Sequence, residues 1–99
     1  MINGIFDVYN QLKAKYSLVM TNSFSVDKGF EIDVPIIVGR AHGQTIWLYV
    51  CDGEFVLDVM DEAHTKGTHW HPFSADAAIA DIEEFMQGKC DYKLTRFPK

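Results

Sequence analysis

The fold is decided by residues 45–60, which read TIWLYVC, then DG, then EFVLDVM. Both seven-residue runs are rich in β-branched and aromatic residues, and the Asp52-Gly53 pair between them is typical of a two-residue type I′ turn. The sequence therefore predicts an antiparallel hairpin. Its register places apolar residues opposite each other on one face, in the pairs Val50–Phe55, Leu48–Leu57 and Ile46–Val59.

A further strand is predicted before this hairpin, because Ile32, Val34, Ile36 and Val38 recur at every second position. A loop of two or of three residues could connect this strand to residues 45–51. A two-residue His42-Gly43 loop would set Gly39 and Pro35 into the apolar face. We therefore expect a three-residue loop with Gly43 in the left-handed conformation. It extends the apolar face through the pairs Val38–Ile46, Ile36–Leu48 and Val34–Val50.

Helical spacing of apolar residues flanks this three-strand meander. It predicts an amphipathic helix over about the first 17 residues and a second helix that starts after Ser74, with Ser74 as its N-cap and Gly88 just beyond its end. Residues 18–29 are compatible with short strands or with loops.

The last predicted element is a strand at an edge of the sheet, in which Cys90, Tyr92 and Leu94 alternate with polar residues. The order is α-(β)-β-β-β-α-β. This order predicts an α+β fold with a mainly antiparallel sheet, made of the central meander and the C-terminal strand, and with both helices packed on one face.

Length and composition limit the class of protein. The 99 residues fit a single domain, 1–99, and 47% of them are hydrophobic. The net charge of −5 argues against nucleic acid as a partner, since phosphate contacts need a basic patch. No run approaches the roughly 20 apolar residues of a membrane span. Cys51 and Cys90 form no CxxC motif, and Met1–Gly4 does not resemble a signal peptide, so we expect a cytoplasmic protein.

Motifs for catalysis are absent from the sequence. No serine lies in a GxSxG elbow, and the glycines around Arg40 lack the spacing of a phosphate-binding loop. We therefore expect a protein that is not an enzyme and that needs no cofactor.

The second face of the predicted sheet is a candidate partner-binding surface. Two helices on the first face would leave this face partly open, and an exposed aromatic patch resembles the centre of a protein interface. The alternatives are that residues 18–29 cover it or that it forms the seam of a homodimer. The residues assigned to partner binding are Ile37, Trp47, Tyr49, Val56 and Asp58, with Trp70 from the following segment.

Histidines are concentrated between Asp58 and Pro72. His64, His69 and His71 lie there, and in an extended segment His69 and His71 project to the same side. Imidazoles with a carboxylate are ligands that zinc, nickel and iron accept. The alternative is a loop whose polar side chains only bind backbone groups.

Two hypotheses of function follow. The first is a non-catalytic interaction module that binds another protein or itself. Its size and acidity resemble those of bacterial immunity proteins. One version is a small acidic inhibitor of a basic toxin or nuclease, to which complementary charge would be supplied by Asp52, Glu54, Asp58, Asp61 and Glu62. The alternative is a small metal- or ligand-binding protein that uses His64, His69 and His71.

Overall fold

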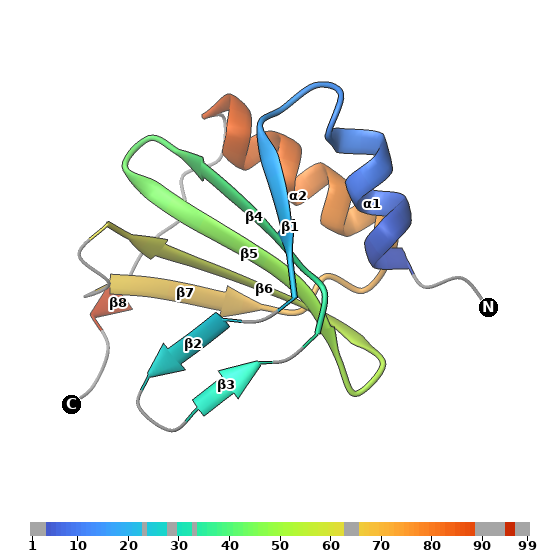
Figure 1. Ribbon diagram of the computed structural model, residues 1–99. Helices are drawn as coiled ribbons and strands as arrows, with labels where there is room; N and C mark the ends of the chain where they lie inside the picture. The colour runs from blue at the N-terminus through green and yellow to red at the C-terminus, as the bar shows by residue number, and fades with distance from the viewer. Residues whose placement is uncertain are drawn as a thin grey trace.

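The computed structural model describes residues 4–22, 24–27, 30–32, 34–62, 66–88 and 95–96. A six-stranded antiparallel sheet has the strand order β1-β4-β5-β6-β7-β8, and β2 and β3 form a separate hairpin (Figure 1). Two helices lie on one side of the larger sheet, as expected for the predicted α+β fold. The elements are α1 (Gly4–Leu12), β1 (Leu18–Thr21), β2 (Phe24–Asp27), β3 (Phe30–Ile32), β4 (Ile36–Ala41), β5 (Gln44–Cys51), β6 (Glu54–Asp61), β7 (Lys66–Trp70), α2 (Ala75–Gln87) and β8 (Thr95–Arg96).

The central β5–β6 hairpin has the predicted register. Asp52 and Gly53 have φ angles of 53° and 78°, the positive values that both central residues of a type I′ turn require. The predicted pairs are all present: Val50–Phe55, Leu48–Leu57 and Ile46–Val59.

The register predicted for β4 and β5 is wrong. His42 and Gly43 have φ angles of 55° and 74°, so the two strands are joined by the two-residue turn. Ile37 pairs with Leu48, and Gly39 pairs with Ile46. Gly39 leaves no cavity in the core, because neighbouring side chains fill the space that its own side chain would occupy. A Cβ atom on Gly39 would lie 2.7 Å from Leu18 Cδ2 and 3.3 Å from Met86 Sδ.

This one-residue shift exchanges the two faces of β4. Ile37 lies on the helix-covered side and is 1% exposed, so its assignment to a partner-binding face is wrong. Ile36 takes the place on the opposite side and joins Trp47 and Tyr49.

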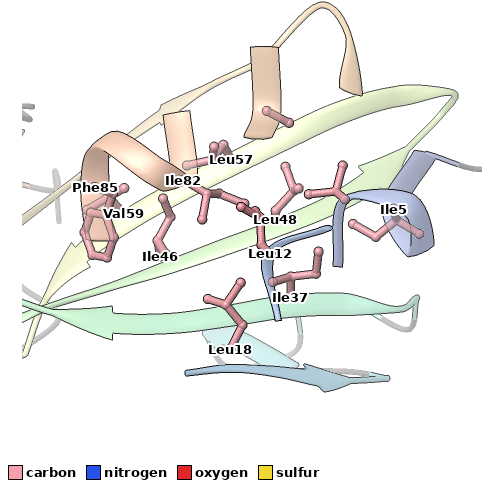
Figure 2. Close-up of a cluster of buried hydrophobic side chains, with 12 residues drawn as sticks. Ile5, Leu12, Leu18, Ile37, Ile46, Leu48, Leu57, Val59, Ile82 and Phe85 are labelled. Carbon is pink, nitrogen blue, oxygen red and sulfur yellow. The ribbon is translucent and has the colours of Figure 1, made fainter. Parts of the chain in front are cut away.

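The helix-covered core joins the larger sheet to both helices (Figure 2). Its buried residues recur at three- and four-residue spacing along the helices and at alternate positions along the central strands. Burying a side chain such as Leu or Ile contributes roughly 1.5–3 kcal/mol. The buried residues of this core are Ile5, Val8, Leu12, Leu18, Ile37, Ile46, Leu48, Leu57, Val59, Ala78, Ile82 and Phe85.

The ends of α2 agree with the sequence. The backbone N–H of Ala77 donates to Ser74 Oγ at 3.1 Å, which makes Ser74 the N-cap. Gly88 has a φ angle of 71° and ends the helix in the left-handed conformation. Neither helix among the described residues is long and apolar enough to cross a membrane.

Several element boundaries differ from the prediction. The first helix ends at Leu12, and the strand expected over residues 31–38 is divided into β3 and β4, with Pro35 between them. Proline has no N–H to donate to a ladder, which favours this break. Residues 18–29 include β1 and β2. The last predicted strand lies outside the described residues at 90–94, and β8 follows it at the edge of the sheet.

Candidate metal centre

Strand β7 brings the histidines to the sheet. The sequence predicted a loop here, but Lys66–Trp70 pairs with β6, with His69 opposite Asp58 and Trp70 opposite Leu57. Directly paired residues of antiparallel strands project to the same face. His69 and Asp58 therefore lie on the face opposite the helices, beside Trp47, which pairs with Asp58 from the other side.

Four polar side chains form a continuous chain across this face. The Tyr49 hydroxyl donates to Asp58 Oδ2 at 3.1 Å. The other carboxylate oxygen, Oδ1, lies 2.5 Å from His69 Nδ1. On the far side of the ring, His69 Nε2 lies 3.2 Å from His71 Nε2. The prediction that His69 and His71 project to the same side is confirmed.

The partners of His69 determine which of its nitrogens carries the proton. An ionised carboxylate only accepts hydrogen bonds, so His69 Nδ1 donates to Asp58. When Nδ1 carries the only proton of the ring, the lone pair lies on Nε2, which faces His71. The same lone pair is the one that a metal ion requires.

Tyr49 anchors the chain from the interior. Its side chain is 6% exposed. Burial, followed by the charge of Asp58 and the hydrogen bond to it, raises the pKa of the Tyr49 phenol well above its usual value. The phenol therefore remains a donor at neutral pH and fixes the orientation of the Asp58 carboxylate.

Exposure increases along the chain toward the histidines. The side chain of Asp58 is 14% exposed and that of His69 is 55% exposed, and His71 is also exposed. The two imidazoles converge at the surface, while the carboxylate that orients one of them is held inside. This arrangement leaves the ligand side of the pair open to an ion from solvent.

The residues assigned to an aromatic partner surface are buried within one chain. Trp47 is 8% exposed and Val56 is 4% exposed, and with Ile36 and Tyr49 they form a second cluster. The β2–β3 hairpin lies on the side of the sheet away from the helices (Figure 1). This burial agrees with the alternative in which the chain covers the face itself.

Trp70 faces the opposite side. Its Nε1–H donates to Asp81 Oδ2 at 2.9 Å, and its ring packs against the helix-covered core. Trp70 therefore attaches β7 to α2. This attachment fixes the strand that carries His69.

The third predicted ligand, His64, lies outside the described residues. Among the residues that the structure describes, no group of three His, Cys, Asp or Glu side chains surrounds a common point. The backbone N–H of Lys66 donates to Asp61 Oδ1 at 3.1 Å.

Sequence reasoning missed that Asp58 belongs with the histidines, because it placed Asp58 on a strand and the histidines in a loop. The strand could have been predicted from Thr68 and Trp70, since Thr and Trp favour β-strands.

Comparisons with protein-family models, with curated proteins and with solved structures find no match to this chain.

Proposed function

We propose that this protein binds a divalent transition-metal ion through Nε2 of His69 and Nε2 of His71. The observation that carries the proposal is their separation of 3.2 Å. Zinc–imidazole bonds of about 2.0–2.1 Å that meet at the tetrahedral angle place two nitrogens about 3.3 Å apart. The two side chains therefore lie at the spacing of a chelating pair.

The position of Asp58 also supports metal binding by His69 and His71. Histidines that bind metals commonly donate their second ring N–H to a carboxylate, which fixes the tautomer and makes the ligating nitrogen more basic. His69 has this partner on the side away from His71. A histidine that served only as a polar surface residue would not need a carboxylate oriented by a buried phenol.

The ligand type narrows the choice of ion. Imidazole suits Zn²⁺, Ni²⁺ and Cu²⁺, whereas Mg²⁺ and Ca²⁺ prefer oxygen ligands. Two neutral imidazoles leave positions open for water or for further ligands. We therefore expect an ion that accepts imidazole ligands, such as Zn²⁺.

The burial of Trp47 and Val56 gives no support to a partner-binding surface at the aromatic cluster. Among the carboxylates of the inhibitor version, Asp58 has its two oxygens engaged by Tyr49 and His69. Exposed carboxylates remain at Asp52, Glu54 and Glu62. Nothing in their arrangement favours a basic toxin over other partners.

Isothermal titration of the tag-free protein with Zn²⁺ and with Ni²⁺ tests the proposal. We expect saturable binding, a loss of at least 100-fold in affinity in the His69→Ala/His71→Ala variant, and a loss of about 10- to 100-fold in Asp58→Asn. His42→Asn is the matched control, since His42 is exposed at the β4–β5 turn and Asn tolerates its positive φ angle.

The control should bind as the parent does. Absence of saturable heat at tens of micromolar metal would overturn the proposal. Parent-like binding by the double variant would overturn it equally.

A further inference from the structure

We infer that the metal ion joins two copies of this chain, and that each copy supplies His69 and His71. This inference rests on the proposed metal binding and adds the identity of the partner. Its starting point is a ligand count. Zinc in structural sites is held by four protein ligands. The described part of one chain brings together two imidazole nitrogens and no larger group.

The exposure of the pair permits a second copy to approach. His69 is 55% exposed and His71 is exposed, so the coordinating edges are not enclosed by their own chain. Homodimers with two-fold symmetry present the same patch from both copies. A two-fold axis through the ion would give four imidazoles from two identical pairs, which matches tetrahedral coordination.

The neighbouring surface also favours a contact at this place. Phe73 follows His71 by two residues and is 93% exposed, the highest value among the large hydrophobic residues described. A phenyl ring left in water is unfavourable, and a contact built around the histidines would bury it. Single exposed apolar residues are ordinary on protein surfaces, and Phe73 is notable because one residue separates it from His71 in the sequence.

The negative net charge of each chain should make dimer formation depend on the metal ion. Each chain carries a net charge of −5, so two copies repel each other. A divalent cation between them supplies opposite charge at the point of contact. The protein should therefore be a monomer without metal and a dimer with it, and a chelator should reverse the change.

Sedimentation velocity during a Zn²⁺ titration tests the inference. We expect the dimer to reach its maximum at one ion per two chains and to decrease when excess zinc loads each histidine pair separately. Phe73→Ser should raise the dissociation constant of the dimer about tenfold or more and leave the histidine pair intact. His42→Asn, the control for metal binding, should leave both metal binding and association unchanged.

Two results would overturn the inference and leave the proposed function in place. One is saturation at one ion per chain with a monomeric protein. The other is loss of binding in His64→Ala, which would place the third ligand within the same chain. If no zinc binds at all, the proposed function fails together with the inference.

Discussion

Gly39 has no side chain, yet it decides which residues of β4 face the helices. The position it occupies is filled by Leu18 from β1 and Met86 from α2. A larger residue there would press on both elements. A pattern of apolar residues in the sequence favours a register that turns Gly39 away from the core. In the folded protein Gly39 faces the core, because the side chains of Leu18 and Met86 occupy the space beside it.

Replacing Gly39 with Val should therefore destabilise the protein by roughly 1–3 kcal/mol, because the added carbons overpack the core. Leu18→Ala in the same chain should recover part of this loss, since Leu18 Cδ2 is the nearest atom. Chemical denaturation of the single and double variants measures the coupling. Strictly additive effects would contradict the packing around Gly39.

The sequence predicts those helices, strands and turns whose signals are local. The Asp52-Gly53 turn fixes the β5–β6 register through two positive φ angles, and Ser74 fixes the start of α2 through one hydrogen bond. The register of β4 and β5 could not be predicted from local sequence signals. His42-Gly43 admits more than one loop, and the decision depends on Leu18 and Met86, which are distant in sequence.

The candidate site shows the same division. The convergence of His69 and His71 follows from their spacing in an extended segment, and the sequence predicts it. The contact between His69 and Asp58 depends on the pairing of β7 with β6. The sequence of β7 contains glycine and histidine and therefore resembles a loop. The role of Tyr49 depends in turn on burial, which no local pattern shows.

The helices cover one face of the larger sheet, and the opposite face is buried around Trp47 and exposed at His69. The residues around Trp47 form the second cluster, which is buried within the same chain. The carboxylate at the edge of this second cluster orients His69. The interior of the domain thus supports the surface site through Tyr49 and Asp58.

This arrangement predicts that Trp47→Glu unfolds the domain. The substitution places an unpaired charge in a buried position, a penalty of several kcal/mol that approaches the stability of a small domain. Val19→Glu on β1 is the matched control, because Val19 is 61% exposed. Circular dichroism during thermal denaturation compares the two variants. A folded Trp47→Glu protein with the transition temperature of the parent would show that this face is open.

We propose that one atom in each ring, Nε2 of His69 and Nε2 of His71, binds the metal ion, while Nδ1 of His69 donates to Asp58. Long-range nitrogen–proton NMR correlation of the imidazoles, recorded without and with zinc, observes these atoms individually. We predict that His69 carries its proton on Nδ1 in both states and that zinc shifts both Nε2 resonances. A proton on Nε2 of His69 in the metal-free protein, or Nε2 resonances that zinc leaves unchanged, would contradict the account.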